Sequence, residues 1–291
     1  STGKMFTAVA ITQLVEQGKL SYNDTLSALL PAYHIVNADR ITILQLLTHT
    51  SGLGTTFTDA FQSSKRDILS NGDWIQFFIN DKPQFEPGKA FSYSNAGFVL
   101  LGAIIERITG KSYYDYVQQH IFAPAGMTHT TYDFSTGNGQ DDVTGYGFDQ
   151  SPAGTSLVPF SDTRKIRGSA AGGAWSTADD LARFFSALQD GRLVAPASYK
   201  RMIQPVIAQS PDLKSDQYGL GFEIYDRNGI RMFGHDGESP FGHTVAQVID
   251  NKYTLIIMSA VPNLWSSSIL PIEFLTGQIS GWSRSQPERC P

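Results

Sequence analysis

The sequence predicts an α+β fold in which helices come first and an antiparallel sheet follows. Apolar residues recur at helical spacing through most of 1–122, whereas runs with strand character occupy most of 219–260. The strand-like runs are joined by short turns and not by crossover helices, which favours an antiparallel sheet. No linker or repeat interrupts the 291 residues. We therefore expect one domain over 1–291, mostly helical at 1–165 and mostly sheet at 166–291.

The helices of the first part are predicted from periodicity and from their end signals. Residues 5–17 carry apolar side chains at helical spacing and end at Gly18, so this helix is expected to bury its apolar side. Further helices are expected at 42–49, around 74–78, at 95–108 before Gly110, and at 112–122 before Pro124.

The second part is predicted from turn residues and strand composition. The stretch 128–168 is rich in Gly, Asp, Thr and Ser and predicts a long loop, with short strands at most, on the rim of a pocket. Ser176 or Thr177 is expected to cap a helix that runs to Leu188. Strands are expected at 219–225, 230–234, 243–249 and 253–260, with a tight hairpin at 250–252 and a final helix at 265–280.

Composition excludes several classes of protein. A hydrophobic content of 41% with 17% charged residues is that of a globular domain, not a disordered chain. The net charge of −5 and the lack of a dense basic stripe argue against a nucleic-acid partner. No apolar run reaches the roughly 20 residues that span a membrane. The single cysteine, Cys290, cannot form an internal disulfide.

The first four residues carry the strongest chemical signal. Ser1 and Lys4 form a Ser-x-x-Lys tetrad that leads into the first predicted helix. Residues three apart on a helix lie on the same face, so the lysine amine can reach the serine hydroxyl. A hydroxyl becomes a good nucleophile when a nearby base takes its proton. The tetrad alone is a weak signal, because Ser1 is equally suited to be a helix N-cap.

Two further motifs follow in order, Tyr93-Ser94-Asn95 and His235-Asp236-Gly237. The chain also contains the runs 46–53, Pro87-Gly88, 172–181 and 218–222, which read LLTHTSGL, PG, GGAWSTADDL and YGLGF. Together these residues resemble the serine β-lactamase and penicillin-binding-protein superfamily, in its class-C-like esterase and D-aminopeptidase branch with a His-x-Gly third motif. The resemblance covers nearly the whole chain and implies a β-lactamase/transpeptidase-like catalytic domain: an antiparallel sheet flanked by helices, with a mostly helical subdomain.

The resemblance implies roles for the three motifs. Ser1 is expected to be the nucleophile, Lys4 its base, and Tyr93 the second general acid and base that also activates the deacylating water. Asn95 is expected to hold Lys4 and a substrate carbonyl by hydrogen bonds. Tyr93 at the head of the second motif indicates the class-C-like branch.

The third motif is expected to begin a strand beside the pocket. His235 would orient a substrate carboxylate or ester and keep Lys4 and Tyr93 correctly protonated. Gly237 would let the substrate lie against the strand, and the main-chain amides of Ser1 and Glu238 would form the oxyanion hole.

Other residues of interest have structural interpretations. His49 is assigned to loop support, and Gly172 and Gly173 to tight backbone packing near the pocket. Because His243, Asp179 and Asp180 lack metal-ligand spacing with other donors, we expect no metal, and no motif implies a cofactor.

The leading functional hypothesis is hydrolysis of small esters or amides through an acyl-enzyme on Ser1. His235 and Asp236 stand where most β-lactamases have Lys and Thr, which lowers the expectation of efficient β-lactam hydrolysis. No Glu-x-x-Leu-Asn motif is present, so deacylation through Tyr93 is favoured over a class-A-like glutamate. D-aminopeptidase, D,D-peptidase and true β-lactamase activity remain alternatives.

Two other classes stay open: an N-terminal nucleophile hydrolase that uses the amine of Ser1, and a penicillin-binding sensor or scaffold without turnover. The expected partner is a small ester, β-lactam or D-amino-acid peptide; the oligomeric state is not predicted. The resemblance also implies a periplasmic or secreted protein with a strand-bearing segment before the serine. The N-terminal strands of the fold are therefore expected to be missing from this chain.

Overall fold

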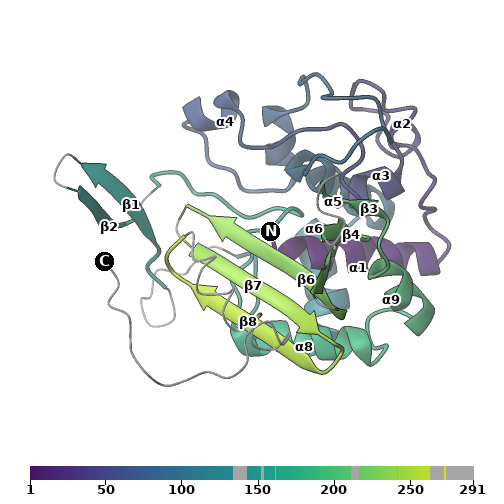
Figure 1. Cartoon of the computed structure of the whole chain (residues 1–291). Helices are drawn as coiled ribbons and strands as arrows, with labels where there is room; N and C mark the ends of the chain where they lie inside the picture. The colour runs from purple at the N-terminus through teal and green to yellow at the C-terminus, as the bar shows by residue number, and fades with distance from the viewer. Residues whose placement is uncertain are drawn as a thin grey trace.

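The chain forms a helical layer and an antiparallel sheet, with a separate hairpin that extends from them (Figure 1). The computed structural model describes residues 1–133, 143–151, 154–160, 162–210, 216–227, 229–240, 242–262 and 272. The named elements within residues 1–133 are helices, and the six-stranded sheet comes from the second half of the chain, so the predicted α+β class is confirmed.

The helical layer is built from short elements around two long helices, α1 (Gly3–Glu16) and α5 (Asn95–Thr109). The shorter elements are α2 (Leu26–Leu29), α3 (Ile43–Leu47), α4 (Asp59–Ser63), the 3-10 helix η1 (Gly72–Phe77), α6 (Tyr113–Val117), the π-helical turn η2 (Gln118–Phe122) and α7 (Ala123–Ala125). Two helices follow later, α8 (Ala178–Gln189) and α9 (Pro196–Met202).

Helix α1 is buried on nearly all sides and not only on its apolar side. Every residue from Gly3 to Thr12 is buried, because the polar ones find partners inside the protein. The Thr7 hydroxyl donates to the carbonyl oxygen of Ala170 at 2.6 Å, and Thr12 shares a hydrogen bond of 3.0 Å with the Tyr22 hydroxyl. Because its buried polar groups are hydrogen-bonded, a helix whose sequence is not strictly amphipathic can be buried on nearly all sides.

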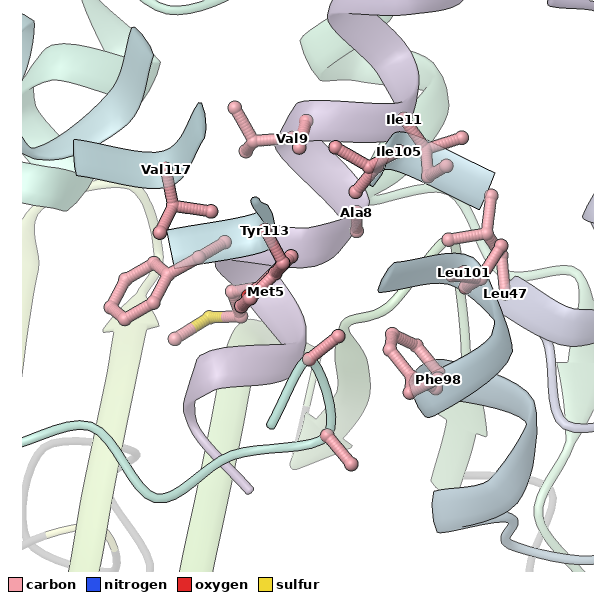
Figure 2. Close-up of a cluster of buried hydrophobic side chains, with 14 of the residues drawn as sticks. Met5, Ala8, Val9, Ile11, Leu47, Phe98, Leu101, Ile105, Tyr113 and Val117 are labelled. Carbon is pink, nitrogen blue, oxygen red and sulfur yellow. The ribbon is translucent and has the colours of Figure 1, made fainter. Parts of the chain in front are cut away.

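The core lies where α1 meets α5 and α6. Figure 2 shows Met5, Ala8, Phe98 and Tyr113 among the side chains that fill this space, all of them buried. Phe6, on α1, makes edge-to-face contacts with Phe122 and Phe184 at 5.1 and 4.9 Å between ring centres. Burying a side chain of this size stabilises the fold by roughly 1.5–3 kcal/mol, so this core holds the N-terminal end of α1 in place.

Six strands form one antiparallel sheet in sequential order: β3 (Ile207–Ala208), β4 (Asp216–Tyr218), β5 (Glu223–Arg227), β6 (Ile230–Ser239), β7 (Gly242–Ile249) and β8 (Tyr253–Ser259). Residues 250–252 join β7 to β8: Asp250 and Asn251 both have φ of 51°, and the Lys252 N–H donates to the carbonyl oxygen of Ile249 at 3.0 Å, which confirms the tight turn predicted there. Helix α8 packs against β8.

Several sequence-based boundaries were wrong. Strand β6 continues to Ser239, five residues beyond the predicted end, because its third-motif residues pair with β7. Strand β5 begins only at Glu223, since a turn with a Gly219 N–H to Phe222 carbonyl hydrogen bond of 2.8 Å precedes it. The short elements α9, β3 and β4 were not predicted, because two to seven residues carry too little periodicity.

The expected loop at 128–168 contains a two-stranded antiparallel hairpin, β1 (Tyr146–Ser151) and β2 (Gly154–Pro159). The predicted helix at 265–280 and Cys290 lie outside the described residues, apart from residue 272. Within the described part of the chain, no helix combines the length and apolarity needed to cross a bilayer. No observation tests whether 1–291 is one domain, so this stays a prediction.

Candidate active site

The Ser1 hydroxyl and the Lys4 amine meet at the start of α1. The Lys4 N–H donates to the carbonyl oxygen of Ser1 at 2.9 Å, which closes the first turn and places both side chains on one face. Lys4 Nζ lies 3.1 Å from Ser1 Oγ. The contact expected from the tetrad is therefore present.

Lys4 is fully buried and held by three acceptors. Besides Ser1, its amine donates to Asn95 Oδ1 at 2.7 Å and to the carbonyl oxygen of Ala171 at 2.8 Å. Burial lowers the pKa of Lys4 well below its ordinary value, while the field of Glu223 opposes this shift. Desolvation favours the free amine, which has two N–H donors for Asn95 and Ala171 and a lone pair that can take the Ser1 proton.

Tyr93 approaches the same pair from the loop before α5. Its ring centre is 4.7 Å from Lys4 Nζ, and 37% of the residue remains exposed. Burial of the phenol raises its pKa above the ordinary value, and hydrogen bonding to Ser1 partly counteracts the rise. The phenol is therefore neutral and can pass a proton between Ser1 and solvent-side groups without becoming a stable phenolate.

Asn95 is free to hold Lys4 because its neighbour caps the helix. The Ser94 hydroxyl accepts the N–H of Gly97 at 3.0 Å and donates to the carbonyl oxygen of Gly54 at 2.8 Å. The residue that caps α5 is therefore Ser94 and not Asn95. Helix α5 thus starts with an amide that points at the lysine.

Two glycines enclose the backbone of Ser1. A Cβ atom at Gly172 would lie 2.7 Å from the main-chain nitrogen of Ser1, and one at Gly237 would lie 3.0 Å from it. Gly172 also has φ of 142°, a conformation that side-chain-bearing residues rarely adopt. The predicted close packing of Gly172 is therefore present, and Gly237 brings β6 against the candidate nucleophile (Figure 1).

His235 is buried within the sheet and uses both ring nitrogens internally. Nδ1 lies 2.5 Å from the carbonyl oxygen of Asp236, so it donates, and Nε2 accepts the Tyr218 hydroxyl at 2.9 Å. Burial, reinforced by the charge of Lys4, lowers the pKa of His235 well below its ordinary value. The expectation that this ring binds a substrate carboxylate is not supported, because neither nitrogen is free and the ring is neutral.

Two acidic residues, Glu223 and Asp236, lie next to His235, and the sequence did not predict a role for either. The Glu223 carboxylate accepts the Asp236 N–H at 3.0 Å and lies 3.8 Å from His235 Nδ1. Gln247 donates to Asp236 Oδ1 at 3.1 Å. Burial and the Asp236 charge raise the pKa of Glu223 to about 8, and burial raises that of Asp236 to about 6. The signal in the sequence that could have pointed to Glu223 is its position as an acidic residue directly after the apolar run 218–222.

The Glu238 N–H, predicted as an oxyanion donor, faces the β5 edge of β6. In an antiparallel ladder, alternate N–H groups point to the same edge of a strand. Because the Asp236 N–H points toward β5, the Glu238 N–H points to the same side, beyond the point where β5 ends. Its side chain is exposed, so only the main chain of Glu238 is suited to the site.

Among the described residues, no three His, Cys, Asp or Glu side chains form a group that could hold a metal ion. The candidate site consists of a serine, a buried lysine, a tyrosine, an asparagine and a glycine-bearing strand.

Fold and site together define a serine β-lactamase-like protein: the family profile described as Beta-lactamase matches residues 1–265, and the chain belongs to that family. It is 32% identical over 79% of its length to the "Putative penicillin-binding protein PbpX" of Bacillus subtilis, covering 55% of that protein. It is 31% identical over 89% of its length to "Penicillin-binding protein 4*" of the same organism, covering 59% of it. The chain thus spans a little over half of these relatives.

Solved structures place the fold in the same superfamily. A penicillin-binding protein from Bacillus halodurans superimposes with a TM-score of 0.83 at 28% identity, covering 94% of this chain and 84% of that one. A D-stereospecific amidohydrolase from Streptomyces superimposes with a TM-score of 0.80 at 26% identity, covering 94% and 85%. The β-lactamase/transpeptidase-like fold predicted from the motifs is confirmed.

Proposed function

We propose that this protein is a serine hydrolase that forms an acyl-enzyme on Ser1 and acts on small esters or amides. The observation that carries the proposal is the contact of 3.1 Å between Ser1 Oγ and the amine of Lys4, whose pKa is lowered by burial. A hydroxyl beside a desolvated amine is the arrangement that serine nucleophiles require.

The geometry supports a two-step reaction. Ser1 Oγ attacks the carbonyl carbon while its proton moves to Lys4, and the developing oxyanion accepts hydrogen bonds from the main-chain N–H groups of Ser1 and Glu238. The C–O or C–N bond then breaks, and Lys4 or Tyr93 returns the proton to the leaving group. Water then attacks the acyl carbon while its proton passes to Tyr93 and the Tyr93 proton moves to Lys4. The bond to Ser1 Oγ breaks, the acid leaves, and Lys4 returns the proton to Oγ.

The neighbourhood of the scissile bond favours substrates without a carboxylate. His235 is neutral, and Glu223 and Asp236 lie behind it. This arrangement supports neutral esters and amides, including D-amino-acid amides, over D,D-peptides and β-lactams, whose carboxylates gain no cation here. The D-stereospecific amidohydrolase among similar structures is consistent with the amide branch. Periplasmic or secreted localisation remains a prediction from the resemblance.

The test is intact mass before and after a fluorophosphonate probe, with peptide mapping of the adduct and turnover of a chromogenic ester. We expect one adduct on Ser1 and none in Ser1→Ala. Lys4→Arg places a guanidinium there, which stays protonated and cannot act as a base, so acylation should fall by about 10²–10⁴-fold.

Each alternative has its own outcome in the same experiment. Acylation that survives Lys4→Ala would support the amine of Ser1 as base, as in an N-terminal nucleophile hydrolase. A stable adduct without ester turnover would support a sensor or scaffold. Absence of any adduct on folded protein would overturn the proposal.

A further inference from the structure

His49 has a left-handed backbone conformation that glycine or asparagine usually adopts. It follows the C-terminus of α3 with φ of 57°, and the Thr50 N–H donates to the carbonyl oxygen of Gln45 at 2.9 Å. Such left-handed positions after a helix are usually occupied by Gly or Asn, because a larger side chain adds about 1 kcal/mol or more of strain. A histidine here departs from local preference, and such departures gather at functional sites.

The side chain of His49 carries a second unfavourable feature. The residue is fully buried, and Nε2 has no hydrogen-bond partner within the described residues. A buried N–H without a partner destabilises a fold by roughly 1–3 kcal/mol. Stability alone therefore does not account for histidine at this position.

His49 accepts hydrogen bonds from the main-chain N–H groups on both sides of Tyr93. The Ser92 N–H donates to the carbonyl oxygen of His49 at 2.9 Å, and the Ser94 N–H donates to His49 Nδ1 at 3.0 Å. Alternate N–H groups of an extended segment point the same way, so one residue can receive both. His49 thus supplies the two acceptors that a neighbouring strand would otherwise offer to the segment 92–94.

The imidazole also contacts the phenol ring itself. The ring centres of His49 and Tyr93 are 4.4 Å apart at an interplanar angle of 36°, and the Tyr218 ring contacts His49 at 4.6 Å. Because Nδ1 accepts the Ser94 N–H, a neutral His49 carries its proton on Nε2. Burial lowers the pKa of His49 well below its ordinary value, which agrees with the neutral ring.

We propose that His49 is a positioning residue for the reaction: its ring nitrogen and main-chain oxygen fix the segment 92–94 so that Tyr93 stays against Ser1 and Lys4. The proposal rests on the proposed function, in which Tyr93 transfers protons. It extends the loop-support role expected from sequence, because it assigns the support to two atoms of His49 and names the amides of Ser92 and Ser94 as their targets.

The test compares His49→Asn with His49→Gly. Both residues suit the left-handed backbone, but only asparagine offers an oxygen near the position of Nδ1. We expect kcat for ester hydrolysis to fall about 10- to 100-fold in His49→Gly with KM changed less than about threefold, because misplacing a proton-transfer group slows chemistry more than binding. His49→Asn should remain within about fivefold of wild type.

Hydrogen exchange at the Ser94 amide provides a readout independent of catalysis. Protection should be lost in His49→Gly and kept in His49→Asn. Full activity of a folded His49→Gly would overturn the proposal, since glycine suits the turn best. If His49→Gly does not fold, His49→Gln serves instead: its oxygen lies one bond farther out, so activity equal to that of His49→Asn would also overturn it.

The two proposals fail in different ways. A wild-type chain that never reacts with the fluorophosphonate probe contradicts the proposed function at Ser1. If the Ser94 amide stays protected in both His49→Gly and His49→Gln, the positioning role is contradicted, whether or not the protein is active.

Discussion

The Glu223 carboxylate takes the place of a strand beside Asp236. Strand β5 pairs with β6 only as far as the Glu223–Gly234 pair, and the next β6 amide on that edge, the Asp236 N–H, donates to Glu223 Oε2 at 3.0 Å. A side chain therefore completes the ladder at the point where the third motif reaches the candidate site. An ionisable group in this position makes both stability and chemistry respond to pH.

Glu223→Gln is expected to reduce the pH dependence of stability. Burial and the Asp236 charge raise the pKa of Glu223 from 4.5 to about 8, so between these pH values the folded protein binds a proton that the unfolded chain releases. This group therefore makes the free energy of unfolding fall as pH rises, by at most about 1.4 kcal/mol per pH unit. Glutamine keeps an acceptor for the Asp236 N–H but does not titrate.

The measurement is urea unfolding of wild type and variant across about pH 5 to 8. Lys4, His49 and His235 have lowered pKa values, so they make the free energy of unfolding rise with pH. Asp236 adds to the effect of Glu223 below about pH 6. The quantity to compare is therefore the difference between the slopes of wild type and variant. Glu86→Gln, which alters an exposed pair with Arg40, is the control and should leave the slope unchanged. Equal slopes for wild type and Glu223→Gln would contradict the prediction.

Gly237→Ala is expected to impair acylation more than folding. The new Cβ would lie 3.0 Å from the Ser1 nitrogen and 3.0 Å from Thr2 Oγ1, closer than ordinary contact. Ser1 must then shift by a few tenths of an ångström, and we expect its reaction with the fluorophosphonate probe to slow by about tenfold or more.

The control for this variant is Gly18→Ala. Gly18 has φ of 69° and nothing within 4 Å of an added Cβ, so alanine there should lower stability by about 1 kcal/mol without slowing acylation. Equal labelling rates for Gly237→Ala and wild type would show that β6 does not constrain Ser1.

Substrates that carry a carboxylate next to the scissile bond are expected to react poorly. The two compounds to compare are D-alanyl-D-alanine and its C-terminal amide, which share the bond to be cleaved and differ in one charge. With His235 neutral, a substrate carboxylate leaves water without gaining a charged partner from the third motif, so we expect kcat/KM to favour the amide by about tenfold or more. His235→Lys should narrow the difference, and a wild-type preference for the free acid would contradict this prediction.

The sequence predicted those parts of the fold whose signals are local. The helix at 95–108 matches α5 to within one residue at its C-terminus, because long apolar periodicity and Gly110 mark it clearly. The Ser-x-x-Lys spacing likewise predicts the contact between Ser1 and Lys4, since one helical turn sets it. The hairpin turn at Asp250 and Asn251 belongs to the same group.

Tertiary packing decided the features that join distant segments. No local signal shows that His49 receives the amides beside Tyr93, or that Glu223 completes the ladder at Asp236, because these pairs are separated in the chain and depend on where α3 ends and β5 begins. The burial of α1 on all sides also follows from its neighbours and not from its own periodicity.

Residue type at short, fixed spacing was enough to predict the family, the α+β order and a candidate nucleophile with its base. The protonation states and orientations in the site depend instead on the tertiary structure. Desolvation lowers the pKa of Lys4 and raises that of Glu223, and internal partners occupy both nitrogens of His235. Burial and hydrogen bonding across the fold set these properties, and neither is encoded in any one segment.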